Sequence, residues 1–419
     1  MTLFDIAAIL LCLSAVFGYV NHRYLRLPPT IGLMVIAMAS SLSVVVIDLI
    51  VPALQVGPRV SEALAQIDFH KALMHGMLSF LLFAGALHVD FSALASRKWA
   101  ISLMATGGVL MSTFIVGASM WYVLQLFGIA IPFMWALVFG ALISPTDPVA
   151  VLGILKTIKV PKRLEAIIAG ESLFNDGVGV VIFTIVLALA LRGEQATLEL
   201  AGVVGLFVSE ALGGVVLGMV VGYLAYRALR TIDEYILEVV ISLALVMVTY
   251  AIALRAHLSG PIAVVVAGLF IGNHGVRFAM SEKTRERLFD FWELIDEILN
   301  SVLFLLIGLE VLLLRFDTGY LAAALLAIPI ALVARLISVS IPILLLSRRD
   351  KFTQGAVPVL VWGGLRGGIS VALAFSLPEN EIKPLILAVT YSVVVFSIVV
   401  QGLTVKAVVA KMVQPATDT

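Results

Sequence analysis

The sequence predicts an all-α membrane protein with about 13 transmembrane helices, and three observations of composition support this fold class. Hydrophobic residues make up 61% of the 419 residues, charged residues make up only 13%, and the mean hydropathy is +1.12. Soluble domains carry about 25% charged residues. A soluble globule of this size could not bury so much apolar surface. The composition therefore excludes a soluble enzyme, a nucleic-acid-binding protein and a disordered scaffold.

Thirteen segments are long and apolar enough to cross a bilayer, which needs about 20 apolar residues per helix. The first segment follows Asp5 and has no basic region before it, so we interpret it as a retained helix rather than a cleaved signal peptide. The predicted spans are 3–20, 30–52, 72–89, 99–127, 131–155, 164–191, 197–226, 235–254, 259–276, 290–313, 319–346, 353–377 and 383–410.

The distribution of lysine and arginine predicts the orientation of these spans, because cytoplasmic loops carry an excess of both residues. With the N-terminus outside, 19 of the 27 basic residues fall in inward loops and 6 fall in outward loops. The remaining two, Arg335 and Arg366, lie inside spans. We therefore expect a multi-pass protein with its N-terminus outside and its C-terminus in the cytoplasm.

The rest of the composition limits the chemistry. The net charge is +0 and indicates no particular partner. The single cysteine, Cys12, excludes an intrachain disulfide and a multi-cysteine metal site. The short loops hold no nucleotide fingerprint and no zinc spacing, so we expect no cofactor.

The span 131–155 is interrupted at Ser144-Pro145-Thr146-Asp147-Pro148. Two prolines three residues apart remove two backbone donors, so the helix must break there. Broken backbone at membrane depth is tolerated where it is buried in protein or lines a cavity. The carbonyls that the break exposes, together with Asp147, are ligands that hard cations prefer. A simple proline kink with Asp147 bonded to loose amides is the alternative, and we favour the binding site.

The span 164–191 carries polar residues on two faces of one helix. Ser172 and Asp176 are four residues apart and share one face, and Glu171 and Asn175 form a second such pair. Asp176 lies about 12 residues, or about 18 Å, from the cytoplasmic end of this span, near the middle of the membrane. An ionisable group at this depth costs several kcal/mol and is a functional candidate. A structural hydrogen-bonding role for Asp176 is the alternative.

The span 353–377 is the second interrupted helix, because Gly363, Gly364, Gly367 and Gly368 surround Arg366. Interrupted helices at corresponding places in two halves of a chain indicate a transporter's binding site. The other intramembrane cation, Arg335, needs an anion. Glu171 or the carbonyls at a half-helix C-terminus would serve, and we favour Glu171 because Asp176 must remain free to titrate.

Three motifs at these separations resemble the bacterial NhaP-type monovalent cation:proton antiporters, which are related to animal sodium/proton exchangers. They are Ser-Pro-Thr-Asp-Pro at 144–148, Gly-Glu-Ser-Leu-Phe-Asn-Asp-Gly at 170–177 and Trp-Gly-Gly-Leu-Arg-Gly at 362–367. The resemblance covers nearly the whole chain. It implies an NhaA-like fold of inverted repeats with two discontinuous crossing helices, a homodimer, and a place in the bacterial inner membrane. It also implies a core domain from about 72–191 and 290–377, and a dimer domain from about 1–52, 197–276 and 383–410.

The resemblance also implies a role for each candidate site residue. The titrating carboxylate falls on Asp176, and the buried ion pair falls on Glu171 and Arg335. Asn175, where a second acid would otherwise stand, resembles the electroneutral branch of the family. The cation ligands fall on Asp176, Asp147, Thr146 (through its main-chain oxygen) and Ser172, and the supporting residues fall on Asn175, Glu171, Arg335 and Arg366. One position departs from the family pattern, because Ala84 stands where some archaeal relatives have a glutamate.

These residues predict a secondary antiporter in which a monovalent cation and a proton compete for Asp176. The cation is Na⁺, with Li⁺ or K⁺ as alternatives, and one titrating carboxylate implies electroneutral exchange by alternating access. An intramembrane aspartyl protease built on Asp147 and Asp176 is a rival hypothesis, but it needs neither two broken helices nor Arg335. A channel or symporter is the other rival, and proton counterflow would separate it from an antiporter. We therefore expect a transporter and not an enzyme.

Overall fold

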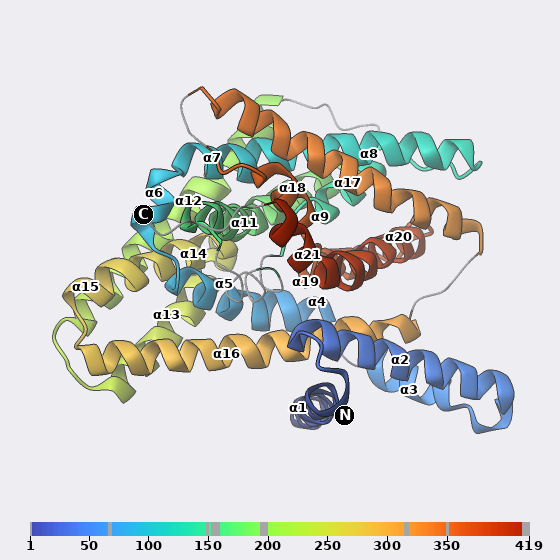
Figure 1. The fold of residues 1–419 in the computed structure, drawn as a ribbon, viewed down its shortest axis with the longest axis horizontal. Coiled ribbons are helices and arrows are strands. Elements are labelled where there is room, and N and C mark those ends of the chain that lie inside the picture. Colours follow the sequence, from blue (N-terminus) through green and yellow to red (C-terminus); the bar gives the residue numbers. More distant parts are fainter. Residues whose placement is uncertain are drawn as a thin grey trace.

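The structure of the chain is a computed structural model that describes residues 2–65, 69–147, 151, 160–192, 200–313, 318–348 and 352–412. Within these ranges every secondary-structure element is a helix, which confirms the all-α prediction (Figure 1). The elements of the first half are α1 (Leu3–Val20), η1 (Asn21–Leu25), α2 (Pro29–Ile50), η2 (Pro52–Leu54), α3 (Val56–Ala65), α4 (Phe69–Lys71), η3 (Ala72–Met77), α5 (Leu78–Leu87), α6 (Phe91–Ser96), α7 (Lys98–Leu103), η4 (Met104–Gly108), α8 (Val109–Leu126), α9 (Phe133–Ile143) and α11 (Lys162–Arg192).

The second half of the chain is helical in the same way, and two of its helices are short pieces separated by a break. Its elements are α12 (Leu200–Leu229), α13 (Tyr235–Arg255), α14 (Gly260–Phe270), η6 (Ile271–Gly275), α15 (Val276–Phe278), α16 (Glu282–Leu309), η7 (Glu310–Leu313), α17 (Thr318–Leu346), α18 (Ala356–Trp362), α19 (Gly368–Phe375), α20 (Lys383–Phe396), η8 (Ser397–Gln401) and α21 (Gly402–Met412).

Ten helices in the described part of the chain are long and apolar enough to cross a membrane. The three other predicted spans are not among these ten helices, and each has a physical reason. The spans 131–155 and 353–377 are interrupted, and α16 is charged over its first half before it becomes apolar. The total of thirteen spans therefore stays a prediction.

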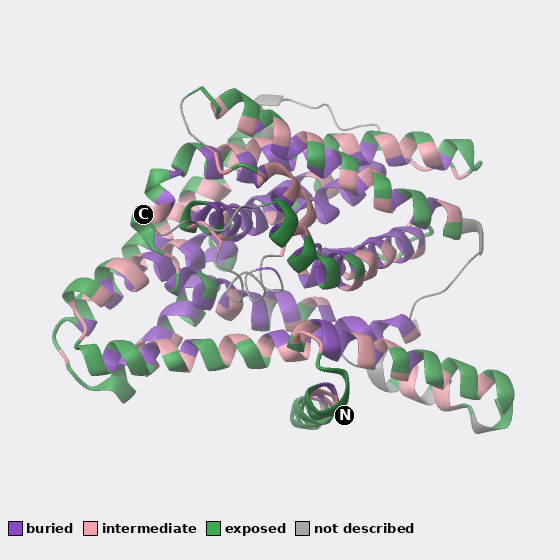
Figure 2. Ribbon diagram, in the orientation of Figure 1, coloured by how far each residue is buried: buried purple, intermediate pink, exposed green. Residues whose placement is uncertain are grey.

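The burial pattern fits a lipid environment. Buried residues concentrate where the helices meet, and exposed residues cover the outer helices (Figure 2). Many of the exposed side chains are large and apolar, such as Leu49, Leu212 and Leu344, which are exposed to 76%, 59% and 74%. Contiguous exposed apolar surface of this kind needs a bilayer or a partner to cover it.

The long helices form two packing groups. In one, α8 packs on α9 and α17, α11 packs on α9, and α20 packs on α17 and α19. In the other, α14 packs on α12, α13 and α5, while α16 packs on α2 and α5. Figure 1 shows the same arrangement, with α16 and α2 side by side and α17 running alongside α8. α1 is seen end-on in that view and crosses α2 and α16.

The packing groups do not coincide with the division of helices that the resemblance implies, at three places. The segment 72–89 was expected in the core, but α5 packs with α14 and α16. The segment 290–313 was expected in the core, but α16 packs with α2 and α5. The segment 383–410 was expected in the dimer domain, but α20 and α21 pack with α17, α18 and η8. The assignment of moving and dimerising domains itself stays a prediction.

Small residues let α12 and α14 approach closely. A side-chain carbon at Gly214 or Gly218 would meet the backbone carbonyl oxygens of Ser259 and Ala263. A side-chain carbon at Gly222 would touch Ala267 and Phe270 of the same helix pair. The GxxxG spacing of α12 therefore serves packing within one chain, as small residues do at helix contacts in membranes.

We expect Gly218→Leu to lower the melting temperature of the purified protein, because the added side chain would push α12 off the backbone of α14. Overpacking of this kind costs about 1–3 kcal/mol. The matched control is Gly205→Leu on the same helix, where an added carbon meets no atom within 4 Å. An unchanged melting temperature for Gly218→Leu, combined with loss of a dimer in size-exclusion chromatography, would place these glycines between protomers instead.

Candidate ion-binding site

Two helix breaks meet in the first packing group. α9 ends at Ile143, and α18 ends at Trp362 before α19 begins at Gly368. The Asp147 N–H donates to the Leu365 carbonyl at 2.8 Å, and the two residues form an isolated antiparallel bridge. The break in α9 follows from Pro145, which has no N–H to continue the helix. Pro148, the second proline of this motif, lies outside the described residues.

Glycines make the crossing possible, because a side chain on either of two positions would block it. A carbon added to Gly367 would overlap the carboxylate of Asp147, and one added to Gly179 would overlap the ring of Pro145. Gly179 therefore lets the broken segment lie directly against α11, which carries Ser172, Asn175 and Asp176.

Thr146 connects the broken segment to α11 through its side chain and its backbone. The Asn175 side-chain amide N–H donates to the Thr146 hydroxyl at 2.8 Å, and the Thr146 backbone N–H donates to the Asn175 side-chain oxygen Oδ1 at 3.4 Å. The hydroxyls of Thr146 and Ser172 are 3.2 Å apart. Thr146 and Asn175 are fully buried. Asn175 therefore holds the broken backbone at a fixed position beside Asp176.

Asp176 is the carboxylate that this scaffold leaves available. It is buried, with 5% of its surface exposed, and within the described residues its carboxylate accepts no hydrogen bond. Asp147 faces it closely enough for the two carboxylates to repel each other. A buried carboxylate in this position needs a proton or a cation, because an uncompensated buried charge is costly.

Arg366 satisfies the carbonyls that the break in α9 leaves without helical partners. Its guanidinium donates to the Ser144 carbonyl at 2.7 Å and to the Pro145 carbonyl at 3.0 Å. The Arg366 backbone N–H donates in turn to the hydroxyl of Ser397 at 2.9 Å. A cation at a helix C-terminus also interacts favourably with the helix dipole. The side chain of one interrupted helix therefore caps the other.

Arg335 binds a backbone carbonyl near the end of α18 and also pairs with an acid. Its guanidinium donates to both carboxylate oxygens of Glu171, one of them at 2.9 Å, and to the Leu360 carbonyl at 3.2 and 3.3 Å. Both side chains are buried. The contact expected between Glu171 and Arg335 is therefore present, and the alternative partner, half-helix carbonyls, is used as well.

The structure brings the predicted site residues together, in two sets. Thr146, Asp147, Ser172, Asn175 and Asp176 surround the crossing, while Glu171, Arg335 and Arg366 support its backbone. Their functional roles stay predictions. Ala84 is buried on α5 in an apolar cluster with Phe83 and Leu87.

Two residues near the crossing were not anticipated from the sequence. Ser397, which accepts from Arg366, donates to the Gln401 side chain at 2.8 Å, and Gln401 donates to the Trp362 carbonyl at 3.1 Å. This chain of bonds satisfies the end of α18. The available signal was Gln401 itself, a buried amide within the apolar segment 383–410.

This geometry is typical of one class of membrane protein. Crossed broken helices beside buried carboxylates, in a bundle of membrane-spanning helices, are the architecture of a secondary transporter. The family model described as sodium/hydrogen exchanger, transmembrane, matches residues 11–411. The chain therefore belongs to the sodium/hydrogen exchanger family.

Individual relatives cover almost the whole chain. The Na⁺/H⁺ antiporter NhaP of Pseudomonas aeruginosa is 50% identical over 413 residues, which is 97% of this chain and 96% of the relative. The Na⁺/H⁺ antiporter NhaH of Halobacillus aidingensis is 37% identical, over 89% of this chain and 91% of its own. The solved structure of the sodium proton antiporter MjNhaP1 from Methanocaldococcus jannaschii has the same fold, with a TM-score of 0.73, 18% identity and 98% coverage of both chains.

We expect Glu171→Ala or Arg335→Ala to lower the melting temperature strongly, because each leaves its buried partner without a counter-charge. Breaking a buried pair costs about 3–5 kcal/mol. Glu379→Ala is the control, because Glu379 is 89% exposed in its pair with Lys383 and exposed pairs contribute at most about 1 kcal/mol. If the double variant Glu171→Ala/Arg335→Ala is no more stable than the less stable single variant, the two residues are not energetically coupled.

Proposed function

We propose that this chain is a secondary antiporter that exchanges a monovalent cation, Na⁺ in the first place, for H⁺. The observation that carries the proposal is Asp176, a buried carboxylate to which no described residue donates a hydrogen bond, beside the bridge between Asp147 and Leu365. The names of the relatives from Pseudomonas and Halobacillus support the choice of ions.

Competition for Asp176 is the proposed basis of coupling. A proton neutralises the carboxylate directly. A cation neutralises it by coordination, with oxygen ligands from Asp147, the Ser172 hydroxyl and the main chain of Thr146, which are the ligand types that hard cations prefer. The two occupants exclude each other, because each needs the same negative charge.

The same competition explains why transport is obligatory exchange. The empty site carries an uncompensated charge, and moving it past the apolar barrier is costly. The protonated and the cation-loaded sites are each closer to neutral, so these two states cross. One proton then exchanges for one cation, and no net charge moves in a cycle.

The packing groups suggest which parts move. We propose that α8, α9, α11 and α17 to α21 move as the core, and that α2, α5, α12 to α14 and α16 form the static body. This revises the division expected from the sequence by transferring α5 and α16 to the static body and α20 and α21 to the core. Tight packing within each group favours rigid-body motion between them.

The proposed setting follows the distribution of charge. The excess of lysine and arginine in alternate loops supports a C-terminus in the cytoplasm and an N-terminus outside. We place the protein in the bacterial inner membrane as a homodimer, in agreement with the exposed apolar surface and the bacterial relatives. No cofactor is required by this mechanism.

We expect Asp176→Asn to abolish the movement of both ions, while the melting temperature stays close to that of the wild type. An amide can neither release a proton nor supply a negatively charged ligand. The measurement is internal pH in proteoliposomes after an imposed sodium gradient. Glu286→Gln, an exposed acid on α16, is the control and should exchange normally. Gradient-driven exchange by Asp176→Asn would disprove the proposed mechanism.

We also expect wild-type exchange to be insensitive to voltage, since Asn175 does not titrate and one carboxylate serves both ions. In proteoliposomes without a sodium or proton gradient, a potassium gradient with valinomycin should produce no more proton flux than the same gradient without valinomycin. Asn175→Asp should not gain voltage dependence if the added acid stays protonated beside Asp176. A wild-type flux that grows with voltage would mean that more than one proton moves per cation.

A further inference from the structure

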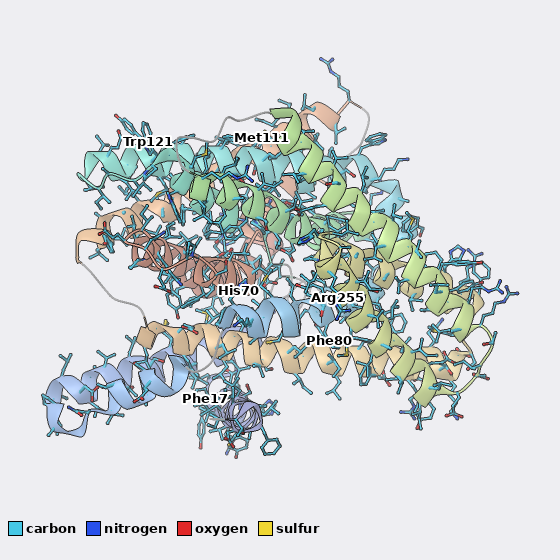
Figure 3. The ribbon with its side chains drawn as sticks, turned by 180° about the vertical axis from the view of Figure 1, so that it is seen from behind. Phe17, His70, Phe80, Met111, Trp121 and Arg255 are labelled. Atoms are coloured by element: carbon cyan, nitrogen blue, oxygen red, sulfur yellow. The ribbon has the colours of Figure 1, made fainter. Side chains whose placement is uncertain are left out.

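A second cavity lies away from the ion site, where α1 crosses α2 and α16. Its volume is about 710 Å³, within the roughly 300–1,000 Å³ typical of ligand pockets. Ser14 and Gly18 line it from α1, Leu33 from α2 and Ser301 from α16. α1 lies at the edge of the molecule in both ribbon views, and Phe17 marks it in Figure 3.

The connection between α1 and α2 brings two arginines to this cavity. The Asn21 side chain donates to the Leu27 carbonyl at 2.9 Å and accepts from the Leu27 N–H at 3.1 Å. Arg26 turns the chain in a left-handed conformation, with φ at 55°. The loop is therefore held in one shape, in which Arg23 and Arg26 both line the cavity.

These positive charges lack an acidic partner within the part of the chain that the structure describes. No carboxylate there pairs with Arg23 or Arg26, in contrast to Arg335 with Glu171 and Lys383 with Glu379. His22 lies beside them on the cavity wall. Ser14, which is 9% exposed, lines the same space, and no described residue bonds to its hydroxyl.

The cavity extends from the connection between α1 and α2 to the uncharged half of α16. α16 carries its last charge at Glu297, and Ser301 lies one turn beyond it. The positive charges of the cavity thus lie at the loop between two predicted spans, where we expect the bilayer surface, and its uncharged wall lies along the membrane-spanning part of α16. α1 exposes apolar side chains on its outer surface, including Val16 and Tyr19.

We propose that this cavity binds an anionic phospholipid, with the phosphate between Arg23 and Arg26 and the acyl chains along α1. Basic pockets between membrane helices on the cytoplasmic side recognise anionic headgroups. Charge complementarity selects the headgroup, and the apolar surfaces of α1 and α2 receive the chains. The Ser14 and Ser301 hydroxyls are available to the glycerol and ester oxygens.

A lipid here would act on the helix that touches the ion site. Ser301 lines the cavity, and two residues further along α16 the side chain of Leu303 packs on Gly368, the first residue of α19. An occupied cavity therefore restrains α16 close to the crossing. This inference does not depend on which ions are exchanged.

The test is the melting temperature of the full-length protein in detergent, with three additives. We expect phosphatidylglycerol to raise it by several degrees, and phosphatidylcholine and inorganic phosphate to have little effect. Arg23→Ala/Arg26→Ala should lose the response to phosphatidylglycerol. Arg285→Ala/Arg287→Ala removes two exposed charges from α16 and should keep it.

A second pair of variants tests the cavity without changing its charge. A side chain at Gly18 would meet no atom within 4 Å, so Gly18→Leu fills the space and should weaken the response to phosphatidylglycerol. Gly205→Leu, equally unhindered on α12, should not.

Four results would overturn the proposal. An equal response to phosphatidylcholine would mean that the charge of the headgroup is not recognised, and an equal response to inorganic phosphate would indicate a site for a free anion. Loss of the response in the Arg285→Ala/Arg287→Ala control would mean that the effect is not specific to the cavity. Loss of dimerisation in Gly18→Leu, without any wild-type response to lipid, would assign the cavity to a second copy of the chain.

Discussion

The arrangement of the ion site depends on how the open ends of two broken helices are satisfied inside the membrane. Backbone carbonyls at this depth find no water, and each unsatisfied group costs several kcal/mol. Arg366 binds the carbonyls of Ser144 and Pro145, and Arg335 binds that of Leu360. Two guanidiniums therefore satisfy the carbonyls that the breaks at Pro145 and at the glycines around Arg366 expose. The polar site exists because these two ends are fixed.

The same two arginines set the charge balance around the site. Glu171, Asp147 and Asp176 supply three carboxylates, while Arg335 and Arg366 supply two positive charges. Glu171 is neutralised by direct contact, and Arg366 is engaged with carbonyls. When all five groups are ionised, the cluster lacks one positive charge. A single proton or a single monovalent cation completes it, which agrees with the one-for-one exchange proposed here.

Contacts between the two packing groups beside the site are small and mostly apolar. Gly177 of α11 lies against Ile262 of α14, and Gly368 of α19 lies against Leu303 of α16. The Tyr391 hydroxyl, which donates to the Ile307 carbonyl, is a polar exception near the C-terminal end of α16. Surfaces of this kind can slide without leaving charges unpaired, so the boundary suits the relative movement that alternating access requires.

The sequence by itself determined the membrane environment, the helical class and the identity of the candidate site, because composition, two prolines around Asp147 and four glycines around Arg366 are local signals. It also narrowed the partner of Arg335 to Glu171 or helix-end carbonyls, and the structure uses both. Only the tertiary structure decided that α16 packs beside α2 and α5, that Arg366 caps α9, and that Ser397 and Gln401 support the crossing. These outcomes depend on which distant segments pack together, and pairings between residues more than 200 positions apart, such as Ser144 with Arg366, leave no periodic trace in either segment.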